Sequence, residues 1–281
     1  MSTDDVTDDG VLAAEDALIE RAARAEWRAI RGDGPPVRAD ELADELEDIE
    51  FEEFERRIRK SVVFRSGVTD PTKEDPRNSP NELIVPGDDP RLERMPERPT
   101  LQDFFEKRFS PTKVHMLQSA RLARLNGHDE KIVLACLLHD IGMAGFIRGD
   151  HGYWGAQLVE PYVDEEVSWA IRAHQALRFF PDESVGYEYP DSYKRLFGED
   201  YTPPGYLQEE YARARRHRWY MSARLITLND LYSFDPDVEV EYEDFADIIG
   251  RHFNTPEEGL GFDNSPVAHM WRTMIWPTRS L

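Results

Sequence analysis

The sequence predicts an all-α protein, a helical bundle from residue 101 onward with an acidic helical extension in front of it. Two observations support this fold class. Apolar residues recur at three- and four-residue spacing over several long segments, as on the buried face of a helix, and strand signals are almost absent. With 40% hydrophobic residues in 281, the chain has enough apolar side chains for a full core.

Residues 1–65 are expected to form the acidic extension. Residues 1–60 hold 19 acidic and 9 basic residues. Residues 11–31 and 40–60 both place apolar side chains at helical spacing, so we expect two amphipathic helices that pack on the main domain. An arm that binds a protein partner or regulates the domain is the alternative.

Residues 66–100 are expected to be a linker or an extended loop. They contain seven prolines and little apolar periodicity. Because proline lacks an amide hydrogen and disfavours helix in the residue before it, no regular helix is expected here. The chain therefore divides into residues 1–65, 66–100 and 101–281.

Residues 101–281 are expected to fold as a series of helices. Ser110 and Asp164 are candidate N-caps, because their side chains can accept a hydrogen bond from the first helical turn. Gly127 is a candidate end of the helix before it. The expected helices cover residues 101–109, 112–125, 130–141, 152–163, 164–179 and 205–231.

Composition argues against several kinds of partner. The formal net charge of −22 repels phosphate backbones and anionic lipid surfaces, so we expect neither nucleic acid nor membrane. The longest wholly apolar run, residues 132–138, is too short to span a bilayer, and the first residues lack a secretory signal. Cys136 is the only cysteine, which excludes an internal disulfide and a cysteine-rich zinc site. We therefore expect a cytoplasmic protein.

A set of histidines and aspartates recurs across the expected helices. Four imidazoles and two carboxylates offer nitrogen and oxygen donors, which suit iron, manganese or zinc. The adjacent pair His139 and Asp140 is informative, because neighbouring helix positions point about 100° apart. The two side chains can then reach different metals, or the carboxylate can bridge two. The candidate ligands are His115, His139, Asp140, His151, His174 and Asp230.

Two polar side chains are candidates for substrate binding beside such a centre. Gln118 lies one helical turn after His115, and Arg178 lies one turn after His174. Each can project toward whatever binds next to the metal. An arginine in a closed site suggests an anionic or polyhydroxylated substrate.

Arg216 and Trp219 are further candidates for substrate binding. In a continuous helix over residues 205–231 they share nearly one face with Asp230, so that face would line a cavity at the centre. Helices that converge on an ion also need small residues where their backbones approach. The candidates for this role are Gly142, Gly155 and Ala156.

Other conspicuous residues are expected to be structural. The arginines of residues 213–218 are expected to form a solvated face paired with nearby acids, and Cys136 is expected to be an inert core residue. The histidines expected to lie on the surface or in the core are His128, His217, His252 and His269.

The order of the candidate ligands, His, His-Asp, His, His, Asp, resembles that of the HD-domain superfamily of metal-dependent enzymes. The similarity covers residues 101–235 and implies an HD-domain helical bundle. The ligand set resembles that of the branch that holds two metals, and this resemblance implies that Asp140 bridges the two metals. By this resemblance the first metal is also held by His115, His139 and Asp230, and the second by His151 and His174.

Two-metal HD proteins include phosphohydrolases and mixed-valent diiron oxygenases, of which the phosphonate dioxygenases and myo-inositol oxygenase are examples. The pattern His115-x-x-Gln118, the stretch of residues 151–156 and the basic Arg178 look like the phosphonate dioxygenases. The resemblance therefore favours an oxygenase that uses two iron ions, Fe²⁺ and Fe³⁺, and O₂ on a small polar or anionic hydroxylated substrate. Residues 103–106 lack the tyrosine that phosphonate dioxygenases carry before the first histidine, so the substrate stays open.

Two other functions remain open. A metal-dependent phosphohydrolase acting on a nucleotide or phosphoester could use the same ligands with Mn, Zn or Co. A metal-stabilised regulatory module without enzyme activity, recruiting a partner through the acidic helices, is the third function. Iron with O₂ consumption distinguishes the oxygenase from a phosphohydrolase, which releases phosphate.

Overall fold

The computed structural model describes residues 93–109, 112–144, 150–191, 193–194, 198, 200–231, 233, 235 and 237–276. The acidic extension, most of the linker and the candidate N-cap Ser110 lie outside these residues, so what was expected of them stays a prediction. Residues 93–100 contain neither helix nor strand, as expected for the end of the linker.

The described part of the chain is helical, which confirms the all-α fold class. Its only β-pairing is an isolated bridge between Asp182 and Tyr187. No helix in these residues is long and apolar enough to cross a membrane. The α-helices are α4 (Leu101–Lys107), α5 (Lys113–Leu125), α6 (Glu130–Leu138), α7 (Ile141–Ala144), α8 (His151–Val159), α9 (Glu165–Leu177), α11 (Gly205–Ala214), α12 (Tyr220–Asp230), α13 (Ala246–His252) and α14 (Ala268–Ile275).

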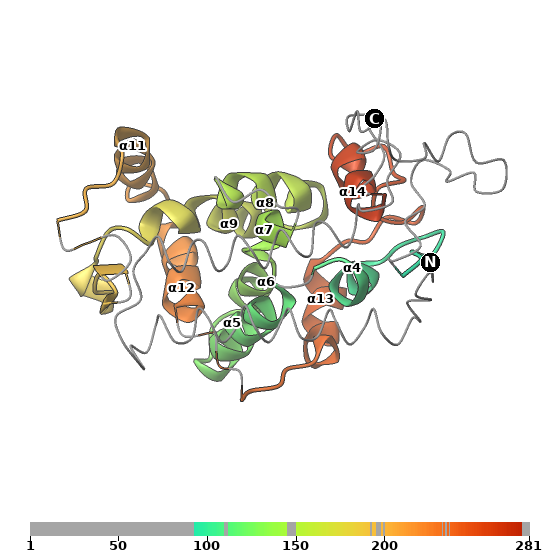
Figure 1. Ribbon diagram of the computed structural model, residues 1–281, viewed down its shortest axis with the longest axis horizontal. Coiled ribbons are helices and arrows are strands. Elements are labelled where there is room, and N and C mark those ends of the chain that lie inside the picture. The colour runs from blue at the N-terminus through green and yellow to red at the C-terminus, as the bar shows by residue number, and fades with distance from the viewer. Residues whose placement is uncertain are drawn as a thin grey trace, which may run out of the picture.

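Helix α6 lies at the centre of the bundle (Figure 1). Every side chain from Ile132 to Leu138 is buried. A helix that is apolar all round is stable only when neighbours cover every side. Helices α5, α9, α12 and α13 pack against α6 and provide this cover.

The last two helices, α13 and α14, extend the same core and were not among the expected elements. The indole of Trp271 in α14 is fully buried, and its ring centroid lies 4.7 Å from that of Phe104 in α4. Its Nε1 donates a hydrogen bond to the carbonyl oxygen of Leu158 at 3.1 Å. Trp271 therefore contacts both α4, near the start of the described chain, and α8.

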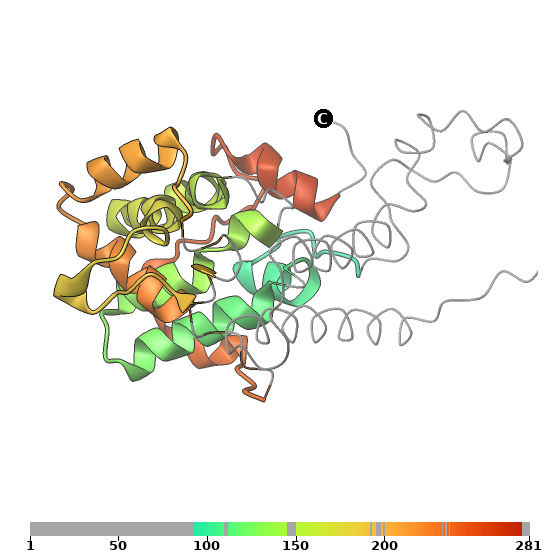
Figure 2. The same ribbon diagram turned by 60° about the vertical axis from the view of Figure 1, so that its left-hand side comes forward.

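The expected helix over residues 205–231 is two helices, so this prediction was wrong. Helix α11 ends at Ala214 and α12 begins at Tyr220, and Figure 2 shows the two orange helices running in different directions. In the turn, the amides of Arg216 and His217 bond to carbonyls three residues earlier, a tighter spacing than in an α-helix. The four arginines of this stretch also place like charges three positions apart, which disfavours a regular helix.

The expected helix over residues 130–141 is also interrupted. Helix α6 ends at Leu138 and α7 begins at Ile141, so His139 and Asp140 lie in the turn between them. Similarly, α8 ends at Val159 and continues as a 3-10 turn. The following Pro161 has no amide hydrogen for the α-helical ladder.

Helix starts are capped partly as expected. Asp164 lies at the N-cap position of α9, but its carboxylate pairs with Lys131 Nζ at 2.6 Å and makes no capping hydrogen bond. Thr100 caps α4 through a capping box, and the Asp129 side chain caps α6.

Candidate metal centre

The six candidate ligands converge near the ends of their helices. They lie in the first turn of α5, in the turn between α6 and α7, at the start of α8, in the last turn of α9 and at the end of α12. In that order they are His115, His139 with Asp140, His151, His174 and Asp230.

The carboxylate of Asp140 lies between two pairs of histidines. Its Oδ2 atom is 3.4 Å from Nε2 of His115 and 3.5 Å from Nε2 of His139. Its Oδ1 atom is 3.3 Å from Nε2 of His151 and 3.7 Å from Nε2 of His174. Each oxygen of one carboxylate therefore faces a different histidine pair.

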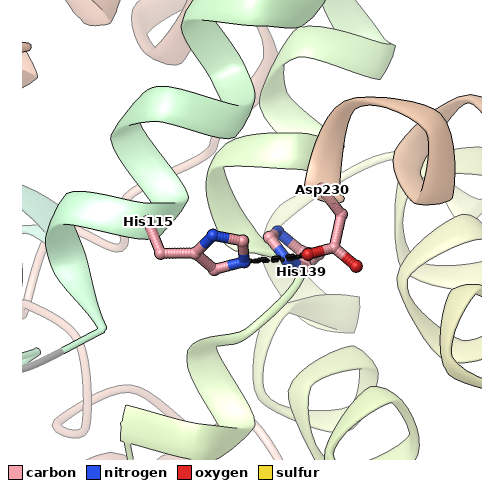
Figure 3. Close-up of side chains that lie close together, drawn as sticks. All are labelled: His115, His139 and Asp230. Carbon is pink, nitrogen blue, oxygen red and sulfur yellow. Dashed lines mark hydrogen bonds and ion pairs between the residues drawn. The ribbon is translucent and has the colours of Figure 1, made fainter. Parts of the chain in front are cut away.

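The second carboxylate, Asp230, faces the first histidine pair. Its Oδ1 atom is 3.0 Å from Nε2 of His115 and 3.5 Å from Nε2 of His139 (Figure 3). Ligand atoms of these three residues lie within 4.8 Å of one another, as do those of His139, Asp140 and His174. Two groups that could each hold an ion therefore meet at His139.

The centre is buried and favours positive charge. The exposed fractions of the six residues lie between 0 and 7%. Burial raises the pKa of the Asp140 and Asp230 carboxyls, but four histidines outweigh burial at Asp140, and Arg178 with two histidines outweighs it at Asp230, so both pKa values lie well below the usual value. Burial lowers the pKa of His115, but the two carboxylates outweigh it and raise this pKa to about 10.

Hydrogen bonds to Nδ1 orient two of the imidazole rings. Nδ1 of His139 lies 2.7 Å from the carbonyl oxygen of Cys136, and Nδ1 of His174 lies 2.5 Å from that of Ile171. Because a carbonyl oxygen only accepts, each Nδ1 must donate. A neutral ring protonated at Nδ1 presents a lone pair at Nε2, the atom that faces the centre.

Ser233 orients the ring of His115 in the same way. Its hydroxyl donates to the carbonyl oxygen of Asp230 at 2.5 Å and therefore accepts from Nδ1 of His115 at 2.8 Å. Sequence reasoning missed this residue. The available signal was its place three residues after Asp230, one helical turn beyond a candidate ligand.

These groups fit a bound cation. The Nε2 atoms of His115 and His139 lie only 3.0 Å apart, and the raised pKa of His115 shows that this space favours a positive charge. The Oδ1 atoms of Asp140 and Asp230 are buried and accept no well-aligned hydrogen bond from the described residues. A buried acceptor left unsatisfied costs about 1–3 kcal/mol, and a bound cation removes this penalty. Imidazole and carboxylate donors suit iron, manganese or zinc.

The segment that carries five of the six candidate ligands is similar to a known family. Residues 112–203 match the family model of the HD domain. HD domains are all-α and typically metal-dependent enzymes, so the HD match supports the superfamily resemblance of this segment. The match covers about a third of the chain and ends before Asp230, which α12 supplies. No curated protein matches the chain.

Close packing within the HD segment depends on glycine. A Cβ atom on Gly142 would collide with the backbone oxygen of His151, and one on Gly155 would lie 3.4 Å from the amide nitrogen of Gly142. The expected close approach at these two glycines is thereby confirmed. Gly152, which the sequence reasoning did not single out, is also crowded, because its Cβ would lie 2.9 Å from the carbonyl oxygen of Ile171 and 3.3 Å from Cε1 of His174.

Arg178 reaches the centre through one of the candidate ligands. Its Nε lies 3.3 Å from Oδ2 of Asp230 and donates a hydrogen bond to the hydroxyl of Tyr193. Burial lowers the pKa of the guanidinium, but Asp230 outweighs burial and raises it, so Arg178 stays charged. Its terminal nitrogens make no hydrogen bond to the described residues.

Gln118 fastens the segment that follows α12. Its Nε2 donates to the carbonyl oxygens of Asp235 at 2.5 Å and Val238 at 2.9 Å, and its Oε1 accepts from the Asp235 amide at 2.7 Å. A side-chain amide has two donor hydrogens, and both are used. The contact with a substrate expected for Gln118 would require these hydrogen bonds to break.

Trp219 and Arg216 lie away from the centre, which corrects the expectation that they share a face with Asp230. Both precede α12, whereas Asp230 is its last residue, so about 16 Å of helix separates Trp219 from Asp230. Trp219 lies beside Trp169 and His217, with ring centroids 6.4 and 5.3 Å away, and Arg216 is exposed. The prediction assumed one continuous helix, but the turn between α11 and α12 interrupts it.

The other histidines have roles outside the centre. His217 stacks on Trp169 with 3.8 Å between ring centroids, and His252 Nε2 lies 2.9 Å from Glu130 Oε2. Among the described residues, neither group that could hold an ion includes His128, His217, His252 or His269.

The basic run and the cysteine are structural, as expected. Arg213 pairs with Glu210 at 2.5 Å, and Arg218 pairs with Glu165 at 3.3 Å, on the surface. Burial raises the pKa of the Cys136 thiol to about 12, so this residue is not a nucleophile near neutral pH.

Proposed function

We propose that the protein is a dinuclear metalloenzyme, and that it is an iron-dependent oxygenase of a small polar or anionic hydroxylated substrate. The HD match and the two groups of buried histidine and aspartate support a metal-dependent enzyme. The two-metal proposal depends on one observation: the two oxygens of Asp140 face separate histidine pairs at 3.3 to 3.7 Å.

The proposed ligands divide unequally between the two ions. Asp140 would be shared by both ions. Four side chains would hold the first ion and three the second, which leaves more positions for substrate or water on the second. The first set is His115, His139, Asp140 and Asp230, and the second is Asp140, His151 and His174.

An iron pair would supply one-electron chemistry with O₂, and the chain would supply binding, orientation and exclusion of water. The terminal nitrogens of Arg178 are available to an anionic or hydroxylated substrate beside the first ion. The burial of all six ligands limits the access of stray water. Arg178 and Gln118 were the two polar side chains that suggested an oxygenase. Arg178 supports the oxygenase more than Gln118 does, because the Gln118 amide already donates to the backbone of Asp235 and Val238.

A phosphohydrolase is the second candidate, and the charged Arg178 beside the centre is compatible with a phosphoester. Mn, Zn or Co in the same site would lower the pKa of a bound water toward about 7. A regulatory module without activity is the third. For either enzyme we expect a small-molecule substrate and a cytoplasmic location, and a protein partner would bind through the N-terminal helices.

The test is anaerobic purification of the full chain, with metal quantification and an EPR spectrum of the half-oxidised protein. The proposal predicts two iron ions per chain, a coupled-spin signal and O₂ consumption with a hydroxylated substrate. Phosphate release from a panel of phosphoesters with Mn, Zn or Co, and without O₂, would favour the phosphohydrolase. A chain that binds one ion or none would contradict both enzymes in this form.

Variants of single histidines provide the matched comparison. His174→Ala is expected to lose one ion of two and all turnover, because it removes a ligand from the second set. His269→Ala changes an exposed histidine outside both groups and is expected to keep two ions and full activity.

A further inference from the structure

Arg178 and Tyr193 contact the side of Asp230 that faces away from the histidines. Oδ1 of Asp230 faces His115, whereas Oδ2 lies 3.3 Å from Nε of Arg178. In Figure 3 one carboxylate oxygen of Asp230 meets His115 and the other points away from it. The same Nε of Arg178 donates to the hydroxyl of Tyr193.

We propose that Tyr193 and Arg178 are positioning residues that together hold the Asp230 carboxylate in the orientation needed to bind the first ion. The inference rests on the proposed metal centre and adds two residues outside the ligand set. We call the chain of contacts from Tyr193 through Arg178 to Asp230 the carboxylate clamp.

Asp230 needs an external contact of this kind. Rotation about the last side-chain bond of aspartate is broad and has no strong preference of its own. Oδ1 lies 3.0 Å from Nε2 of His115 but accepts no well-aligned hydrogen bond from the described residues, so a second contact, on the other oxygen, is needed to fix the carboxylate. The charged contact of Oδ2 with Arg178 fixes the rotation and leaves Oδ1 directed at His115 and His139.

Arg178 is itself held at both its backbone and its side chain. Its amide donates to the carbonyl oxygen of His174 at 3.2 Å, and its own carbonyl oxygen accepts from the hydroxyl of Tyr187 at 2.8 Å. Its guanidinium carbon lies 5.3 Å from the ring centroid of Tyr193. An arginine side chain loses rotamer entropy when it is ordered, and contacts that order it beforehand reduce this cost on metal binding.

Tyr193 is suited to this role because it is buried and packed. Its exposed fraction is 7%, and its ring centroid lies 6.0 Å from that of Phe179 and 5.9 Å from that of Tyr189. Tyr193 and Arg178 fall within the HD segment, whereas Asp230 lies beyond it. The clamp therefore connects the segment that carries five candidate ligands to the sixth.

The test compares two tyrosine-to-phenylalanine variants in the full, metal-free chain. Tyr193→Phe keeps the ring and removes the hydroxyl that accepts from Arg178. Tyr189→Phe is the matched control, because the buried hydroxyl of Tyr189 has no hydrogen-bond partner among the described residues. Calorimetric titration with Mn²⁺ measures both binding steps, and circular dichroism reports the fold.

The clamp predicts a selective effect on one binding step. Loss of an outer contact to a metal ligand costs about 10- to 100-fold in affinity, so Tyr193→Phe should weaken one step about 10-fold and Arg178→Ala about 100-fold. The double variant should bind no more weakly than Arg178→Ala, because Tyr193 acts through Arg178. Tyr189→Phe should bind like the wild type.

Two results would overturn the clamp alone while the two-ion centre stands. One is a Tyr193→Phe protein that binds both ions as tightly as Tyr189→Phe does. The other is an equal loss at both steps with a lower unfolding midpoint of the metal-free variant, which would indicate a general structural role. A wild-type chain that binds no Mn²⁺, Fe²⁺ or Zn²⁺ would overturn the clamp together with the proposed function.

Discussion

The backbone oxygen of His151 occupies the space where a side chain on Gly142 would begin. This contact brings α7 and α8 together and sets the first residue of α8 beside the turn that carries Asp140. Because His151 lies 3.3 Å from Asp140 Oδ1, a backbone contact without any ligand atom controls the geometry of the second ligand set.

Gly142→Ala should therefore damage the second ligand set. The added methyl group must displace the backbone at His151, and overpacking of this kind costs about 1–3 kcal/mol of unfolding free energy. We expect the variant to bind one ion instead of two. Urea unfolding and metal quantification measure both effects.

Gly250→Ala provides the control for this variant. Gly250 lies in α13, and a Cβ atom on it would meet no other atom within 4 Å, so alanine there should add about 0.4–1 kcal/mol of stability and leave both ions bound. A Gly142→Ala protein that behaves like Gly250→Ala would show that the contact with His151 does not matter.

Gln118→Ala should reduce stability more than it affects substrate binding. The substitution leaves the partly buried backbone groups of Asp235 and Val238 without their partner, and the cost should not exceed the value of about 1–3 kcal/mol for a fully buried group. We expect a lower urea midpoint and a KM within about twofold of the wild type, since the hydrogen bonds of the amide go to the backbone at Asp235 and Val238. A large rise in KM with unchanged stability would restore the substrate-binding role.

Trp219→Ala and Arg216→Ala should leave the reaction unchanged. Both residues precede α12, and Arg216 is exposed, so Arg216→Ala should change the unfolding free energy by less than about 0.5 kcal/mol. Trp219→Ala should be less stable, because it loses the contacts with the rings of Trp169 and His217. It should keep two ions and the wild-type KM. A raised KM in either variant would mean that the turn before α12 reaches the substrate.

Local patterns were enough to predict the fold class and the candidate ligands. The apolar run of α6 and the pair His139 and Asp140 can be recognised from a few neighbouring residues. The break before α12 was missed because helical periodicity continues in the sequence across residues 215–219 even where the backbone turns. One helical phase was extrapolated across that turn, which put Arg216 on the same face as Asp230 although the helix is interrupted between them.

Contacts between distant residues could not be predicted in this way. Ser233 meets His115 across 118 positions of the chain, and Gln118 meets Asp235 across 117. A serine or a glutamine carries no local signal for such a partner. The same holds for Tyr193, whose hydroxyl meets Arg178 only because the segment after α9 folds back.

Metal binding should stabilise the fold as well as complete the centre. An ion that binds only the folded chain adds about 2.7 kcal/mol at a free concentration of about 100 times its Kd. We expect the thermal midpoint to fall when a chelator removes the ions and to recover when metal is restored. In His115→Ala, which lacks a ligand of the first set, the chelator should lower the midpoint by a smaller amount. Equal midpoints with and without chelator would contradict this coupling.

The most direct test of the account is anomalous diffraction from a crystal of the full chain loaded with Fe²⁺ or Mn²⁺. The account predicts two anomalous peaks, one on each side of the Asp140 carboxylate, with Oδ2 and Oδ1 each bound to a different ion. A single peak, or two peaks of which one does not contact Asp140, would contradict the bridging role of this residue.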